Sequence, residues 1–140
     1  MVSRTRLLLA DDHLDTAFQL RALLQPEFEV IAHVTDGRAL VRDAARLLPD
    51  VIVSDISMPE LDGITAAAMI LECNPTARII FVSVHADPVL VARGLATGAL
   101  GYVLKLAAGD DLVPAVYAAL RGERHVSSGL HVDELRQSGR

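Results

Sequence analysis

Residues 51–63 read VIVSDISMPELDG, and this stretch decides the fold class. It opens with a short run rich in branched residues, Val51–Ser54, which is typical of a strand buried on both faces of a sheet. Asp55 follows the run directly, and a loop containing Pro59 and ending at Gly63 comes next. The stretch therefore predicts a buried strand that delivers a carboxylate to the edge of a parallel sheet.

The same alternation extends outward in both directions. Short branched runs alternate with longer segments of helical period, which indicates βαβ units. The expected strands are Arg6–Ala10, Phe28–Val34, Val51–Ser54, Arg78–Ser83 and Gly101–Leu104. The expected helices are Leu14–Leu24, Arg38–Leu48, Ile64–Glu72, Val89–Ala96 and Asp110–Leu120, the last with Asp110 as its N-cap. We expect a doubly wound α/β domain with a five-stranded parallel sheet.

The length of 140 residues predicts one domain with a sizeable core. The helical and strand periodicity ends near Arg121. Residues 122–140 contain Gly, Ser, His and charged residues with little apolar periodicity. We expect residues 1–121 to form the domain and residues 122–140 to be a linker or C-terminal tail.

The composition excludes several classes of protein. Hydrophobic residues make up 51% and charged residues 22%, which is typical of a globular chain and not of a disordered one. The net charge of -5 has the wrong sign for wrapping nucleic acid. Cys73 is the single cysteine, so no internal disulfide can form, and the first ten residues are too short an apolar run for a signal peptide. We expect a cytoplasmic protein that binds neither nucleic acid through this segment nor a membrane.

Polar residues follow all five expected strands, but those after the second strand, Thr35 and Asp36, are interpreted as an ordinary turn and helix start. Ligands of open parallel sheets bind outside the carboxyl ends of the strands, so the remaining residues are the candidates for a site. Asp11 and Asp12 follow the first strand, and Asp55 follows the third. Ser83 ends the fourth strand and Lys105 follows the fifth.

The three strand-end carboxylates predict a metal site. Carboxylates that converge repel one another, and a bound divalent cation is the simplest way to keep them ionised together. Oxygen ligands without a His or Cys pattern favour Mg²⁺. The five histidines lack metal-ligand spacing and are expected to be polar surface or loop residues. The alternative for Asp11 and Asp12 is a pair of solvated turn acids at the start of a helix.

Asp55 is the candidate nucleophile for an acyl phosphate. Ser83 and Lys105 support this interpretation, because a transferring phosphoryl group needs donors and a cation on its oxygens. Lys105 is also the only lysine among thirteen basic residues, which indicates a position that requires a compact ammonium. The alternatives are a carboxylate that only ligates metal, a polar strand end at Ser83 and a solvated charge at Lys105.

Four motifs occur in the order of a known family: LLADDH at 8–13, DISMPELDG at 55–63, IIFVSVH at 79–85 and GALGYVLK at 98–105. Over residues 5–121 the chain resembles the receiver domain of bacterial two-component response regulators. The resemblance is strongest to the subfamily that carries a C-terminal LuxR/FixJ-type helix-turn-helix. It implies a flavodoxin-like (βα)5 fold with strand order 2-1-3-4-5.

The resemblance also implies a phosphoacceptor and its metal. Asp55 would accept a phosphoryl group from the phosphohistidine of a sensor histidine kinase. Asp12 and Asp55 would ligate Mg²⁺ directly, Asp11 would act partly through water, and the backbone carbonyl of Ser57 would complete the protein ligands.

A conformational switch is implied as well. Lys105 and the Ser83 hydroxyl would hold phosphoryl oxygens, and Tyr102 would turn inward when Ser83 moves toward the phosphate. The alternative for Tyr102 is an aromatic strand residue whose hydroxyl lies at the surface.

The expected function is a phosphorylation-dependent switch, not a turnover enzyme, with transcription as its output and a homodimer through residues 89–121. The alternatives are a phosphorylation-independent interaction module and a stand-alone receiver without a DNA-binding output. A flavodoxin-like flavin enzyme would need a Ser/Thr/Gly-rich loop where Asp-Asp-His stands. An aspartyl-phosphate phosphatase would need a second Asp where Ser57 stands.

Overall fold

The computed structural model describes residues 4–130, so residues 131–140 of the expected tail lie outside the described part. The strands are β1 (Arg6–Ala10), β2 (Glu29–Val34), β3 (Val51–Ser54), β4 (Ile79–Ser83), β5 (Gly101–Leu104) and β6 (His125–Val126). The helices are α1 (Leu14–Leu24), α2 (Gly37–Leu47), α3 (Gly63–Cys73), α4 (Pro88–Ala96) and α5 (Ala108–Leu120).

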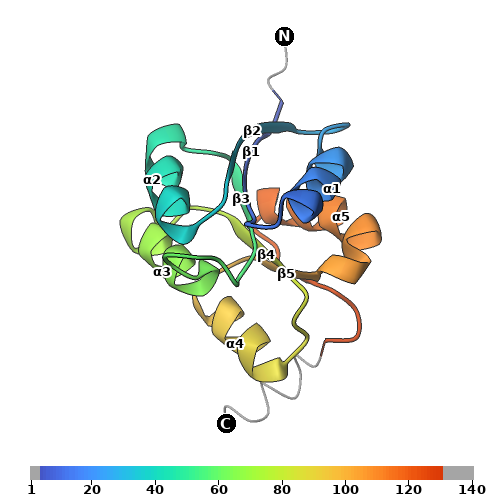
Figure 1. Cartoon of the computed structure of the whole chain (residues 1–140). Coiled ribbons are helices and arrows are strands. Elements are labelled where there is room, and N and C mark those ends of the chain that lie inside the picture. The colour runs from blue at the N-terminus through green and yellow to red at the C-terminus, as the bar shows by residue number, and fades with distance from the viewer. Residues whose placement is uncertain (1–3, 131–140) are drawn as a thin grey trace.

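One parallel sheet forms the centre of the molecule, in the order β2-β1-β3-β4-β5-β6. The doubly wound fold and the order 2-1-3-4-5 are therefore confirmed, and the short β6 adds a sixth strand that the sequence did not predict. Helices α2, α3 and α4 cover one face of the sheet, and α1 and α5 cover the other (Figure 1). The order reverses between β1 and β3, which places a crevice at their carboxyl ends.

Alternation along β1 shows how the sheet divides the core. Leu7 and Leu9 pack into the cluster under α1 and α5, while Leu8 and Ala10 pack into the cluster under α2, α3 and α4. All four side chains are almost fully buried. A strand covered on both faces has no polar side, and this is why the runs were continuously apolar instead of alternating.

Most of the helices begin at a short polar side chain that accepts a backbone N–H group. Asp36, Asp62 and Asp87 accept backbone N–H groups at the starts of α2, α3 and α4. The prediction that Asp110 caps α5 is wrong, because a 3₁₀ turn over Lys105–Ala107 runs directly into a helix that begins at Ala108. Asp110 instead lies in the first turn, where a carboxylate favours the helix dipole. Within residues 4–130, none of the helices combines the length and apolar character that crossing a membrane requires.

Residues 125–130, which we call the C-terminal strap, fold back onto β5. The Ser127 N–H donates to the carbonyl of Tyr102 at 3.0 Å. The Ser127 hydroxyl donates to Asp111 Oδ2 at 2.7 Å and accepts the Leu104 N–H at 3.1 Å. Ser127 is buried, so these bonds replace contacts with water for the backbone of β5.

Ser127→Ala should lower the free energy of unfolding by about 1–3 kcal/mol, because it removes the acceptor of the Leu104 N–H and the donor to Asp111. Urea unfolding followed by circular dichroism measures the change. Ser128→Ala is the matched control, since Ser128 is exposed and should change stability little. Equal stability of the two variants would contradict a role for the strap in holding β5.

Candidate functional site

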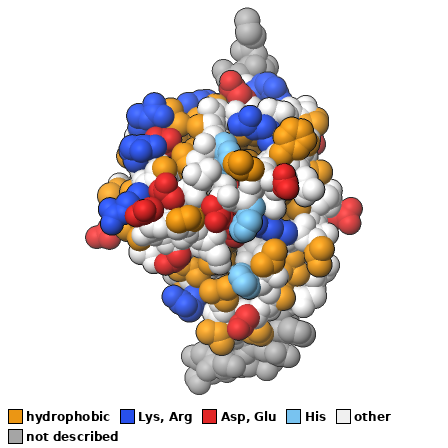
Figure 2. Space-filling model, in the orientation of Figure 1, with side chains coloured by type: hydrophobic (Ala, Val, Ile, Leu, Met, Phe, Trp, Pro, Cys, Tyr) orange, Lys and Arg blue, Asp and Glu red, His pale blue; other side chains and the backbone are white. Residues whose placement is uncertain are grey.

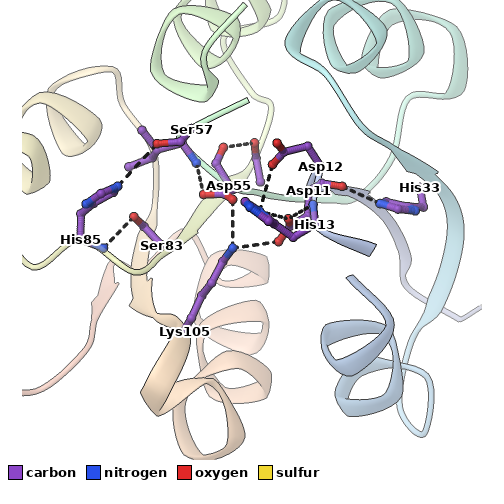
Figure 3. A network of polar contacts seen from close by, with 11 residues as sticks. Asp11, Asp12, His13, His33, Asp55, Ser57, Ser83, His85 and Lys105 are labelled. Carbon is purple, nitrogen blue, oxygen red and sulfur yellow. Dashed lines mark hydrogen bonds and ion pairs between the residues drawn. The ribbon is translucent and has the colours of Figure 1, made fainter. Parts of the chain in front are cut away.

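The site forms at the carboxyl ends of β1 and β3, where the hydrogen bonds of the sheet continue for one residue beyond each strand. The Asp11 N–H donates to the Val34 carbonyl at 3.0 Å, and the Asp55 N–H donates to the Ala10 carbonyl at 2.8 Å. Both carboxylates therefore leave the same edge of the sheet, and they point toward one another (Figure 3).

A glycine lets the following loop pack against Asp55. The Gly63 N–H donates to the Ile56 carbonyl at 2.7 Å, which closes the loop of residues 56–63. A Cβ at Gly63 would lie 2.1 Å from the Asp55 carbonyl oxygen, far inside van der Waals contact. The glycine is thus required by close backbone approach, and any side chain there would displace the backbone that carries Asp55.

Lys105 joins the two buried carboxylates. Its Nζ lies 2.9 Å from Asp55 Oδ2 and 3.1 Å from Asp11 Oδ2, and only 13% of its side chain is exposed. Burial opposes the ammonium charge, but the hydrogen bonds to Asp55 and Asp11 outweigh it and raise the pKa of Lys105 above its ordinary value. Lys105 is therefore a buried ion-pair partner, and the alternative of a solvated surface charge does not hold.

Asp12 completes a cluster that could hold a cation. Ligand atoms of Asp11, Asp12, His13 and Asp55 all lie within 4.8 Å of one another. Among the described residues, the buried Asp12 Oδ1 receives no hydrogen bond, whereas the buried Asp11 Oδ2 is held by its ion pair with Lys105. Three carboxylates against one ammonium leave two negative charges, which suits a divalent cation with oxygen ligands. The residues present therefore fit Mg²⁺, and Asp11 is not a solvated turn acid.

The loop after β4 links Ser83 to Tyr102 through the backbone of His85. The His85 N–H donates to Ser83 Oγ at 3.0 Å, and the Tyr102 hydroxyl donates to the His85 carbonyl at 2.8 Å. Tyr102 is fully buried, and burial raises the pKa of its phenol. The ring therefore already lies inward here, and the alternative of a surface hydroxyl is wrong.

Three histidines that were not assigned a role from their spacing lie around the carboxylates. The His13 Nδ1 lies 3.2 Å from Asp12 Oδ1, and the His33 Nε2 lies 2.8 Å from the Asp11 carbonyl oxygen. The His85 Nε2 lies 3.5 Å from the hydroxyl of the exposed Ser57 (Figure 3). Each histidine stands within three residues of a strand end, and this position was the available signal in the sequence.

Exposed apolar side chains border the site. Leu14 and Phe18 on α1 are 69% and 74% exposed, and Leu106, directly after Lys105, is fully exposed. Acidic and histidine side chains gather near the middle of this face, with hydrophobic side chains around them (Figure 2). Exposed apolar side chains beside a polar site provide area that a protein partner can bury.

The sequence of this chain is similar to that of a known protein family. Residues 7–117 match the family described as "Response regulator receiver domain". The transcriptional regulatory protein LiaR of Bacillus subtilis is 37% identical over 139 residues, which cover 96% of this chain and 66% of LiaR. This chain spans about half to two thirds of the length of the first curated relatives that it matches.

Solved structures agree with this match. A LuxR-family response regulator from Aurantimonas sp. SI85-9A1 superposes with a TM-score of 0.88 at 28% identity, over 99% of this chain and 100% of that one. The receiver domain of RcsB from Salmonella enterica serovar Typhimurium, solved with the phosphate mimic BeF3-, gives 0.84 at 28% identity, over 91% and 96%. RcsB has also been solved as two dimers bound to two parallel DNAs, with a TM-score of 0.83 at 28% identity over 91% and 66%.

The single lysine allows a direct test of the ion pairs. In protein labelled only at lysine, the Lys105 side chain should titrate with a pKa above its ordinary value, measured by NMR. A raised pKa in the folded state stabilises the fold at neutral pH, and this contribution is lost as the pH rises through that pKa. Asp55→Asn should lower the pKa, because it removes a paired charge while the burial remains.

Asp12→Asn is the matched control for this titration. It removes a neighbouring carboxylate that makes no ion pair with Lys105 within residues 4–130, so the pKa should fall less. Equal effects of the two variants would mean that Lys105 responds to the overall charge of the site and not to its ion pair with Asp55.

Proposed function

We propose that this chain, which belongs to the response regulator receiver-domain family, accepts a phosphoryl group on Asp55 from a sensor histidine kinase and changes conformation in response. The observation that carries the proposal is the Lys105 ammonium placed between Asp55 and Asp11. An ammonium fixed beside a nucleophilic carboxylate can stabilise the charge of a transferring phosphoryl group. The protein acts as a self-phosphorylating switch and not as a turnover enzyme.

The transfer itself exchanges one bond for another. A carboxylate oxygen of Asp55 attacks phosphorus, the P–O bond forms as the P–N bond to the kinase imidazole breaks, and the imidazole leaves with the bonding electron pair. Asp55 is oriented by the Ile56 N–H on Oδ1, at 2.7 Å, and by Lys105 on Oδ2. Ser83 Oγ accepts the His85 N–H, so its own proton is available for a phosphoryl oxygen.

Mg²⁺ is the cofactor in this proposal. Asp12, Asp55 and the Ser57 backbone carbonyl would hold it directly, and Asp11 would act partly through water. The bound ion would neutralise negative charge on the phosphoryl oxygens. The buried Asp12 Oδ1, which receives no hydrogen bond from residues 4–130, supports this assignment.

The kinase approaches over the apolar rim formed by Leu14, Phe18 and Leu106. These side chains are exposed, and hydrophobic side chains lie around the acidic and histidine side chains of this face (Figure 2), so a partner that presents a phosphohistidine to Asp55 would bury apolar area there. Burying exposed apolar side chains supplies binding free energy without requiring any charge at the centre. In this proposal the reaction takes place in the cytoplasm. A reducing compartment suits a chain whose single cysteine, Cys73, cannot form an internal disulfide.

The output leaves through residues 89–121, which we propose as a homodimer surface. Leu95, Leu112 and Val116 are buried in the core, whereas Val89 is exposed on α4. Because β6 covers the edge of β5, a second copy would meet α4, the C-terminal strap and α5. RcsB, a structural relative of this chain, has been solved as dimers, which supports self-association.

Control of transcription is the proposed consequence of the switch. The curated relatives are longer proteins, and LiaR and DegU bear the name of transcriptional regulatory proteins. In this proposal residues 1–121 form the receiver with the C-terminal strap added to the edge of its sheet, and the chain leads from the strap to the output. The alternative, an interaction module that does not depend on phosphorylation, is separated by the next experiment.

Incubation with acetyl phosphate and Mg²⁺ should add one phosphoryl group, detected by intact mass, because Asp55 is the strand-end carboxylate beside both Lys105 and the loop of Ser83. Asp55→Asn should abolish the labelling. Asp15→Asn, at an acidic position in the first turn of α1, is the control and should label normally. Undiminished labelling of Asp55→Asn would sink the assignment, and unlabelled wild type would favour the interaction module.

The route of the signal can be tested at Tyr102. When beryllofluoride saturates Asp55, amide chemical shifts across residues 89–121 should change, and self-association should change with them. Tyr102→Ala should remove this response while labelling of Asp55 persists, because the variant loses the contact with the His85 carbonyl. Tyr102→Phe separates the hydroxyl from the ring. Unchanged shifts in wild type at saturation would exclude the route.

A further inference from the structure

We propose that His33 is a positioning residue for the magnesium site, acting through the backbone that joins Asp11 to Asp12. The inference rests on the proposed function, because it concerns the same acidic cluster. His33 itself would not touch the ion or the phosphoryl group. Its role would be to fix the peptide from which the two carboxylates project.

The contact is a hydrogen bond from the His33 imidazole to the Asp11 carbonyl. His33 Nε2 lies 2.8 Å from this oxygen, and the side chain points from β2 toward Asp11 (Figure 3). A carbonyl oxygen only accepts, so Nε2 must carry the proton. The bond therefore fixes both the ring and the tautomer of His33.

The bonded carbonyl belongs to the peptide unit between Asp11 and Asp12. Rotation of a planar peptide moves the Asp12 N–H and its Cα together with the carbonyl. Asp12 carries the buried Oδ1 that receives no hydrogen bond from residues 4–130. A bond that holds the Asp11 carbonyl thus also limits where Asp12 can place its carboxylate.

The end of β2 holds the two peptides that flank the Asp11 Cα, one through Val34 and the other through His33. The Val34 carbonyl accepts the Asp11 N–H at 3.0 Å, and the preceding residue, His33, donates to the Asp11 carbonyl. On the other side, the Asp11 carboxylate accepts the His13 N–H at 2.8 Å. Of these three bonds, only the one from His33 can be removed without changing the backbone or a carboxylate of the site.

His33 is also placed where it can be replaced without opening the core. It lies on β2, an edge strand of the sheet, and it is half-buried. Its side chain borders a small open hollow of about 160 Å³, lined also by Leu14, Phe18 and Arg21. A different side chain can extend into this hollow, so substitution should leave the fold intact.

A purely structural role makes a different prediction. If the imidazole only satisfies a carbonyl, its loss should lower stability and leave metal affinity unchanged. If it positions the acidic pair, its loss should weaken Mg²⁺ binding more than it affects folding. Groups that orient metal ligands from outside the coordination shell commonly change affinity 10–100-fold when removed.

The experiment measures the Mg²⁺ dissociation constant by amide NMR titration of the whole chain with MgCl₂ alone, together with urea unfolding of each variant. His33→Leu should weaken binding by about tenfold, since it removes the donor. His33→Gln should bind within about threefold of wild type, because its amide N–H replaces the Nε2 donor. Arg21→Leu is the matched control, since it changes the same hollow without contacting Asp11, and should bind as wild type does.

A kinetic measurement adds a second criterion. The rate of acetyl phosphate labelling of His33→Leu should recover at saturating Mg²⁺, so the variant raises the half-saturating Mg²⁺ concentration and leaves the maximal rate nearly unchanged. If His33→Leu fails to fold, His33→Asn takes its place, because its amide nitrogen ends about where the imidazole Nδ1 lies and falls short of the carbonyl.

The two proposals fail in distinguishable ways. Asp12→Ala should bind Mg²⁺ much more weakly than wild type, and equal affinity of these two proteins would overturn the metal site itself. Weak binding by Asp12→Ala together with wild-type affinity of His33→Leu would overturn only the positioning role. Loss of affinity in His33→Gln equal to that in His33→Leu would also overturn it, because the retained donor would then be without effect.

Discussion

The ion pairs of Lys105 with Asp11 and Asp55 are the interaction on which the arrangement of the site depends. An isolated buried carboxylate is strongly unfavourable, and two of them side by side are worse. The ammonium lies about equally close to both, at 3.1 and 2.9 Å, and therefore offsets both desolvation and mutual repulsion. Such pairs are sensitive to geometry, because removing one partner leaves the others buried and unpaired. The ends of β1, β3 and β5 are consequently tied to one point.

From this point the contacts continue along β5. Leu104, the neighbour of Lys105, donates its N–H to Ser127 in the C-terminal strap, and the Tyr102 carbonyl accepts the Ser127 N–H. The Tyr102 side chain reaches the loop of Ser83 through His85. A displacement of Lys105 would therefore move the C-terminal strap through the two hydrogen bonds of Ser127. It would move the loop between β4 and α4 through Tyr102. Closely packed interiors respond to such displacements by changing between discrete arrangements.

Residue pattern was sufficient to predict the sheet and the convergence of its polar residues. Parallel strands all end at one edge, so the position of Asp11, Asp55 and Lys105 at strand ends already implied that they meet. The C-terminal strap was not predictable in this way, because a strand of two residues has no periodicity and Ser127 acts through hydrogen bonds to the backbone. The contact of His33 with the Asp11 carbonyl could not be predicted for the same reason. Every residue type carries the same backbone carbonyl, so the sequence does not mark which one accepts a hydrogen bond. The start of α5 depended on a 3₁₀ turn that shifts the helix two residues ahead of its polar signal.

Asp11 and Asp12 are neighbours in the sequence, but they differ in exposure and in the groups that they contact. The Asp11 side chain is 1% exposed and pairs with Lys105, so its charge is already largely compensated inside the protein. The Asp12 side chain is 27% exposed, and its Oδ1 lies 3.2 Å from Nδ1 of the solvent-facing His13. A cation arriving from solvent therefore meets the less compensated carboxylate first. In the proposed function, the ion would lie in the acidic cluster and the phosphoryl group beside Lys105, and Asp55 belongs to both surroundings.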